Sequence, residues 1–205
     1  MEALQMITVC YNYYNNKRLF EKIKEVWKDY PHLLFVDDGS KEEPLHSWDM
    51  LPGWQLYRIN EDLTWNYNGA RNVAMENTPS ELNLLMDLDH VPNEELLRDL
   101  NNLPVKKGYL NFLFRVAHED GEYKKHTSQF LIFKEDFDEV GGYQEKTTGY
   151  GQDGKFRKKL PHHELPEKYK IIEIAEWASP PEYTKEFKLK LRDIPNPGYT
   201  YERIT

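Results

Sequence analysis

The hydrophobic and polar positions in the first half of the chain form short apolar runs separated by amphipathic segments. The apolar, partly β-branched runs predict buried strands at residues 5–11, 33–36, 55–59 and 82–86. Between them, apolar residues repeat at helical spacing over residues 19–29 and 70–77. Strands and helices that alternate with short connections predict right-handed βαβ units and a mainly parallel sheet.

The pattern changes in the second half of the chain, where a polar hairpin joins two strands. We expect strands at 109–116, 130–133 and 170–175, a helix at 94–101 and a short basic helix at 155–160. The sequence therefore predicts one α/β domain over residues 1–178, with halves of about 1–103 and 104–178. Residues 179–205 are Pro-rich and aperiodic, which predicts a C-terminal arm on the surface.

Composition and charge narrow the class of protein. The net charge of −8 argues against a nucleic-acid partner, whose phosphates need a basic surface. Cys10 is the single cysteine, which excludes an internal disulfide and fits a reducing compartment. No apolar run is long enough for a membrane span, and the N-terminus lacks the pattern of a signal peptide. A cytoplasmic protein is the expectation.

The strand predicted at 82–86 runs directly into two carboxylates, Asp87 and Asp89. Ligands of open α/β sheets bind beyond the carboxyl ends of the strands. Carboxylate oxygens there suit Mg²⁺ or Mn²⁺, and such a metal typically neutralises phosphate oxygens. The tripeptide Asp-x-Asp alone does not identify a metal site, because a second copy, Asp136-Phe137-Asp138, lies in what looks like a solvated helical turn.

Several further motifs stand at the predicted strand ends and turns, in a fixed order along roughly residues 7–160. They are Tyr11-Asn12, Asp37-Asp38-Gly39-Ser40, Gly69-Ala70-Arg71-Asn72, Asp87-Leu88-Asp89, Gly141-Gly142-Tyr143 and Gly149-Tyr150-Gly151-Gln152-Asp153. This series resembles the inverting glycosyltransferases of the GT-A fold, and most closely those of family 2. The resemblance implies a Rossmann-like nucleotide-binding half fused to an acceptor-binding half.

The resemblance also implies a role for each nucleotide-sugar contact. Asp38 would hold the uracil or ribose, although it could instead form an Asx turn before Gly39. Arg71 would lie near the diphosphate, although it could instead form a surface salt bridge on its helix. Asp87 would contact the ribose or a metal-bound water, and Asp89 would bind the Mn²⁺ or Mg²⁺ ion directly. Tyr11, Asn12 and Leu88 complete the predicted nucleotide-sugar contacts.

Asp153 matches the general base of the family, which takes the proton of the acceptor hydroxyl. Its alternative is an N-cap of the helix that follows. The family has a Glu before this Asp, whereas this chain has Gln152. Gln152, Trp65 and Tyr150 are the predicted contacts to the acceptor or the sugar.

The third metal ligand is the least determined position. His163, in the tandem pair His162-His163 just past the basic helix, is the candidate that the resemblance favours. His118 and His126 are further options, and His90 is expected to support the carboxylates from behind.

The resulting hypothesis is a metal-dependent hexosyltransferase. It would move a sugar from a nucleotide-sugar, with UDP as the expected nucleotide, to a hydroxyl of a glycan or other acceptor, with inversion. One alternative is a non-catalytic nucleotide- or carbohydrate-binding module of the same fold. Another is a haloacid-dehalogenase-type phosphatase, in which Asp87 would be the nucleophile and Asp89 the acid/base.

Overall fold

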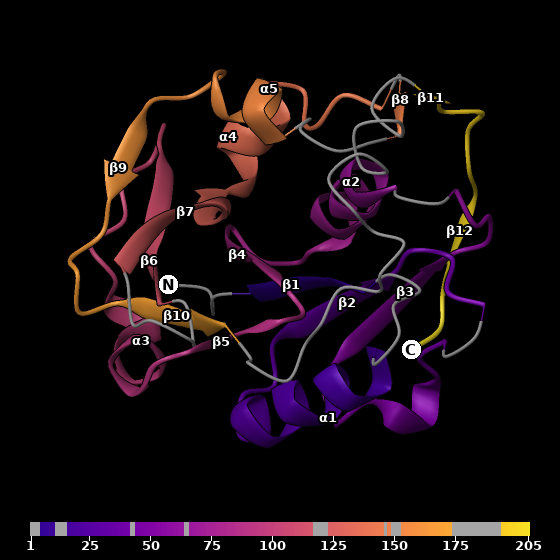
Figure 1. The fold of residues 1–205 in the computed structure, drawn as a ribbon, viewed down its shortest axis with the longest axis horizontal. Helices are drawn as coiled ribbons and strands as arrows, with labels where there is room; N and C mark the ends of the chain where they lie inside the picture. The colour runs from indigo at the N-terminus through magenta and orange to yellow at the C-terminus, as the bar shows by residue number, and fades with distance from the viewer. Residues whose placement is uncertain are drawn as a thin grey trace.

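The structure is a computed structural model that describes residues 5–10, 16–41, 44–63, 66–116, 123–145, 147–148, 153–173 and 194–205. Within these ranges the chain forms one ten-stranded mixed sheet with helices on both faces (Figure 1). The strand order is β12-β3-β2-β1-β4-β7-β6-β10-β5, and β9 pairs with β6 beside this path. None of the helices in these ranges has the length and apolar character needed to cross a bilayer.

Four parallel strands build the nucleotide half. They are β1 (Gln5–Cys10), β2 (Leu33–Asp37), β3 (Gln55–Ile59) and β4 (Leu82–Asp87). The register pairs Cys10 with Asp37 and Val9 with Asp87, so β2 and β4 end on either side of the end of β1. The parallel βαβ prediction is confirmed, and it brings the polar residues after β2 and β4 to one edge of the sheet.

Burial on both faces explains why these strands read as continuous apolar runs. Leu33 and Phe35 pack on one face with α1 (Asn16–Trp27) and α3 (Glu94–Asp99). Leu34 and Val36 face the opposite way, toward α2 (Tyr67–Asn77), α4 (Lys134–Glu139) and α5 (Asp153–Arg157). Figure 1 shows α1 and α3 below the sheet, and α2, α4 and α5 above it.

The rest of the sheet mixes both directions. β7 (Tyr123–Phe133) pairs antiparallel with β4 and with β6 (Leu110–Val116), whereas β9 (His162–Glu164) and β10 (Lys170–Glu173) pair parallel with β6. The short strand β5 (His90–Pro92) pairs antiparallel with β10. β7 begins at Tyr123, well before the predicted start at residue 130. Its first part is polar and carries no apolar run, but it pairs with the outer end of β6, for example Lys124 with Arg115.

The helices α1 and α2 begin earlier than the sequence pattern predicts, whereas α3 and α5 end earlier. α3 ends at Asp99 and continues as a 3-10 turn, Leu100–Asn102, and α5 ends at Arg157. A second 3-10 turn, Ser47–Asp49, follows β2.

The C-terminal residues differ from the aperiodic arm that the sequence predicts. β12 (Tyr201–Arg203) pairs antiparallel with β3, and β11 (Ile194–Pro195) pairs with β8 (Thr147–Thr148). Strands this short leave no periodicity to detect, and pairing with a neighbouring strand holds them in place. Just past β12, for example, Ile204 N–H donates to the Leu56 carbonyl of β3 at 2.8 Å.

Candidate active site

The carboxylate of Asp87, at the last position of β4, is held by three side chains. Arg71 Nη2 of α2 donates to Asp87 Oδ1 at 2.9 Å, and Tyr67 O–H donates to the same oxygen at 3.3 Å. Gln129 Nε2, from β7, lies 3.5 Å from Asp87 Oδ2. Donors from a helix and from a neighbouring strand therefore fix the orientation of this carboxylate.

Arg71 is fully buried, which does not fit the alternative of a surface salt bridge. Its guanidinium carbon lies 4.2 Å from the centroid of the Tyr67 ring, and Nη1 donates to the Tyr143 hydroxyl at 3.1 Å. Burying a cation is costly unless it is paired and hydrogen-bonded. The carboxylate, the aromatic face and the hydroxyl meet this requirement together.

Asp87, Asp89 and His90 form a group that can hold a metal ion. Each offers one ligand atom, and the three atoms lie within 4.8 Å of one another. His90 Nδ1 lies 2.5 Å from Asp89 Oδ1, and the Asp87 and Asp89 side chains are 28% and 17% exposed. The oxygens of the two partly exposed carboxylates suit Mn²⁺ or Mg²⁺, and the imidazole adds a nitrogen donor beside them.

His163 is not brought to these carboxylates. It lies on β9, in register with Asn111, which pairs with Leu131, which pairs with Leu84 of β4. Three strand spacings of about 4.8 Å separate it laterally from β4, roughly 14 Å in all. Its Nε2 lies 3.2 Å from the Pro104 carbonyl oxygen. Within the described residues, the histidine beside the two carboxylates is His90 and not the predicted His163.

Leu88, between the two carboxylates, points away from them. Its side chain is buried in the core cluster on the α1 side of the sheet. A contact from Leu88 to a nucleotide would therefore have to come from its backbone.

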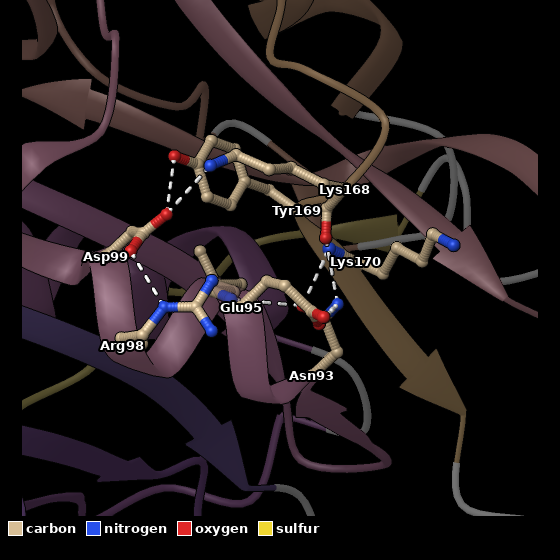
Figure 2. A network of polar contacts seen from close by, with 8 residues as sticks. Asn93, Glu95, Arg98, Asp99, Lys168, Tyr169 and Lys170 are labelled. Carbon is tan, nitrogen blue, oxygen red and sulfur yellow. Dashed lines mark hydrogen bonds and ion pairs between the residues drawn. The ribbon is translucent and has the colours of Figure 1, made fainter.

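A network of polar contacts behind β5 fixes the strand that begins with His90 (Figure 2). Asn93 follows β5 directly and caps α3, where its Oδ1 accepts from Leu96 N–H. The same oxygen accepts from Lys170 N–H at 3.0 Å, and Asn93 Nδ2 donates to the Lys168 carbonyl at 2.8 Å. The end of β5 is thus tied to both α3 and β10, and β10 pairs with β5 along its length.

The two neighbouring acids after β2 have different environments. Asp37 Oδ1 accepts from Ser40 N–H at 3.0 Å, and Oδ2 accepts from Leu45 N–H at 3.2 Å. Arg58 Nε adds an ion pair at 3.4 Å. Because both of its oxygens have partners in the protein, Asp37 shapes the loop.

Asp38 is 1% exposed, and its Oδ1 has no hydrogen-bond partner within the ranges that the structure describes. Burial raises the pKa of Asp38 to about 8, the backbone N–H of Asn66 opposes this, and the charges of Asp37 and Asp62 add to it. A buried carboxyl oxygen without a partner is rare in native proteins. It is the kind of group that a ligand satisfies.

Asn66, which the sequence analysis did not select, lies beside Asp38. Its side chain is buried, and its Nδ2 also lacks a partner among the described residues. The only signal in the sequence was its place between Trp65 and the Gly69-Ala70-Arg71-Asn72 motif.

Tyr143 directly follows the turn at Gly141-Gly142 and binds Arg71, and Gly142 allows this turn to lie close to α2. Gly142 has φ +58°, and a Cβ there would lie 2.9 Å from Asn72 Oδ1. The Tyr143 ring stacks on Phe156 of α5, with centroids 4.2 Å apart. The helix that begins at Asp153 is therefore anchored to the side chain that binds Arg71.

Asp153 is the first residue of α5, but its side chain lies outside the described part of the structure. Its role as general base stays a prediction. The same holds for predicted contacts whose residues lie outside the described ranges, namely Tyr11, Asn12, Trp65, Tyr150 and Gln152.

Residues 6–172 match the family model described as glycosyl transferase family 2. The chain therefore belongs to glycosyl transferase family 2, and its α/β fold matches that of the GT-A glycosyltransferases, as the sequence analysis predicted. No curated protein sequence matches the chain.

Solved structures with this fold include TarS of S. aureus, at 15% identity and a TM-score of 0.61, over 82% of this chain and 36% of that chain. TarS 1-349 is similar at 16% identity and a TM-score of 0.56, over 82% and 60% of the two chains. GlyE of Streptococcus pneumoniae TIGR4 gives 13% identity and a TM-score of 0.51, over 80% and 46%. The chain thus spans 36% to 60% of the length of these proteins, and the likeness shows the fold.

Proposed function

We propose that this protein transfers a sugar from a UDP-linked donor to an acceptor hydroxyl, with inversion and with a divalent cation. One observation carries the proposal. The carboxyl of Asp38, whose Oδ1 has no hydrogen-bond partner among the described residues, and the metal-ligand group at Asp87, Asp89 and His90 follow strands on either side of β1. Two strand spacings, roughly 10 Å, lie between them. That separation suits a nucleoside at one end and its diphosphate at the other.

The hydrogen-bonding groups of Asp38 and Asn66 favour uracil as the base at the nucleoside end. Asp38 Oδ1 can accept a hydrogen bond, and the side-chain amide of Asn66, the residue whose backbone N–H binds Asp38, can donate one. An acceptor next to a donor complements an edge that presents an N–H next to a carbonyl. The imide edge of uracil has this pattern.

Asp87, Asp89 and His90 would hold the cation, and Arg71 would keep Asp87 oriented toward it. A bound Mn²⁺ or Mg²⁺ acts as a Lewis acid that neutralises the diphosphate as it departs. Asp87 also pairs with Arg71 and Asp89 with His90, and Asp89 would be the direct ligand of the cation.

Asp153 would take the proton from the acceptor hydroxyl. The hydroxyl oxygen forms a bond to the anomeric carbon, the bond from that carbon to the diphosphate oxygen breaks, and the proton moves to the carboxylate. Attack opposite the leaving group inverts the anomeric centre. The packing of α5 on Tyr143 supports this role. The helix that begins with Asp153 thereby contacts Tyr143, which binds Arg71, the residue that holds Asp87.

The proposal is tested by UDP release from a panel of UDP-sugars with Mn²⁺, Mg²⁺ or EDTA, beside the variants Asp89→Ala and Asp153→Asn. We expect slow release from one sugar that needs the cation and is lost in Asp89→Ala. UDP binding without turnover of any donor and acceptor pair would favour the binding module. Hydrolysis of an aryl phosphate in place of a UDP-sugar would favour the phosphatase.

A further inference from the structure

The C-terminal segment, residues 199–201, lies beyond the residues that match the family model, yet Tyr199 packs against α2, the helix that carries Arg71. Thr200 fixes it against the end of β3. Asn60 N–H donates to the Thr200 carbonyl at 3.0 Å, and Thr200 N–H donates to Glu61 Oε2 at 2.7 Å. Glu61 in turn touches the loop after β2, because a Cβ on Gly39 would lie 2.5 Å from its carbonyl oxygen.

Tyr199 lies against the first turn of α2. A Cβ on Gly69 would lie 2.7 Å from Tyr199 Cε1, so the ring occupies space that only a glycine leaves open. The Tyr199 hydroxyl donates to Glu145 Oε1 at 3.0 Å. Burial and the Glu145 carboxylate raise the pKa of Tyr199 well above its usual range. The hydroxyl therefore stays a donor at all physiological pH values.

Hydrogen bonds connect Glu145 to the metal-ligand group through three residues, Asn72, Tyr143 and Arg71. Glu145 Oε1 also accepts from Asn72 Nδ2. Asn72 bridges the backbone of Tyr143, accepting from its N–H at 2.9 Å and donating to its carbonyl at 3.0 Å. The Tyr143 hydroxyl accepts from Arg71 at 3.1 Å, and Arg71 donates to Asp87 at 2.9 Å.

We propose that Tyr199 is a positioning residue of the donor site, which acts on Arg71 and Asp87 through Glu145, Asn72 and Tyr143. The inference rests on the proposed function, since it concerns binding of the nucleotide diphosphate. Without the Tyr199 hydroxyl, Glu145 loses one of two donors that fix it, and the orientation of Asn72 and Tyr143 loosens. Arg71 and Asp87 then spend less time in the arrangement that binds the donor.

The test compares Tyr199→Phe with Tyr201→Phe in the full chain, using calorimetry with UDP and Mn²⁺. Tyr201 is a matched control because the same substitution removes a hydroxyl that accepts from Asn77, at the far end of α2. A single hydrogen bond predicts about 3- to 10-fold weaker UDP binding for Tyr199→Phe. Tyr201→Phe should bind UDP like the native protein, and both should melt within a few degrees of it.

A double-mutant cycle with Glu145→Ala separates positioning from general stabilisation. If Tyr199 acts through Glu145, adding Tyr199→Phe to Glu145→Ala should change the UDP affinity by less than about twofold. Additive losses, or an equal loss in Tyr201→Phe, would overturn the inference. Native-like UDP binding by Tyr199→Phe would also overturn it and leave the proposed function standing. A native protein that fails to bind UDP would overturn both.

Discussion

The tripeptide Asp-x-Asp occurs twice in the chain, as Asp87-Leu88-Asp89 and as Asp136-Phe137-Asp138. In both copies the middle residue is buried, with 6% exposure for Leu88 and 4% for Phe137. The first copy leaves the end of β4, and its carboxylates meet His90 in one ligand group. The second copy lies inside α4, and its carboxylates point to different places.

The backbone explains the difference. Asp87 ends β4, and Leu88 and Asp89 form the turn into β5, which brings Asp89 and His90 close to Asp87. In α4, residues two positions apart lie about 200° apart around the helix. Asp136 is therefore buried, with Oδ2 accepting from Gly108 N–H at 2.7 Å, while Asp138 is exposed and pairs with Lys134. The expectation of a wholly solvated turn is wrong for Asp136. The comparison shows that the same pattern becomes a candidate ligand site only where the backbone makes its carboxylates converge.

The largest difference between the two copies is expected when one acid is removed from each. Asp89→Ala should lower UDP-sugar turnover by about 100-fold or more, because several kcal/mol of charge stabilisation depend on the cation. Asp138→Asn should leave turnover unchanged. The measurement is UDP release with saturating Mn²⁺, and equal rates for the two variants would remove the distinction between the copies.

A third acid extends the comparison, because Asp38 is buried like Asp136 but its Oδ1 has no partner among the described residues. The folded pKa of Asp38, about 8, lies above its ordinary value of 3.8, so the folded state keeps a proton that the unfolded state releases. The free energy of unfolding is then expected to fall as the pH rises from about 5 to about 7, by on the order of 1 kcal/mol per pH unit.

Urea unfolding at several pH values checks this, with Asp38→Asn as the reference that lacks the titrating group. The native protein should lose stability relative to Asp38→Asn as the pH rises. Parallel pH profiles would contradict the assigned environment of Asp38.

The buried acid of the second copy should matter for stability and not for chemistry. Asp136→Ala leaves the Gly108 N–H without its acceptor, which predicts a loss of about 1–3 kcal/mol in the free energy of unfolding. Chemical denaturation measures this loss. Turnover of the folded variant should equal that of the native protein, and a stability within error of the native value would argue that water replaces the carboxylate.

The smallest effect is expected for the exposed acid of the second copy. Asp138 Oδ2 lies 3.4 Å from Lys134 Nζ in an i,i+4 pair, and the Lys134 and Asp138 side chains are 32% and 58% exposed. Such pairs contribute about 0.5 kcal/mol or less. Asp138→Asn should therefore unfold within that margin of the native protein in the same assay, and its deviation should shrink further in 0.5 M salt, as expected for a screened pair.

The parallel core could be predicted from the sequence because burial on both faces makes β2 and β4 continuous apolar runs. Placing Asp87 and Asp89 at a strand end followed from that core. The polar part of β7 and the short β12 could not be predicted, because their backbone pairing leaves no apolar pattern.

Which side chains pair with the acids of the site depends on contacts between segments that are distant in the chain. His90 follows Asp89 directly in the chain, but its place in the sequence does not show that it, and not His163, shares the ligand group; the sheet register separates the two. The same limit applies to Asp37 and Asp38, which are adjacent in the chain. Which of them keeps an unpartnered oxygen is decided by Leu45 and Arg58, contributed by the loop after β2 and by β3.

The pairing of β12 with β3 has a consequence for the order in which the protein folds. The outer edge of the nucleotide half is closed by residues about 140 positions later in the chain, as in the contact of Asn60 with Thr200. Contacts this distant form late, because the intervening loop must close first. A nascent chain that has not yet emerged past residue 199 exposes β3 as an open edge, the kind of surface on which strands of separate chains pair. Chaperone capture during synthesis would therefore be most useful in this interval.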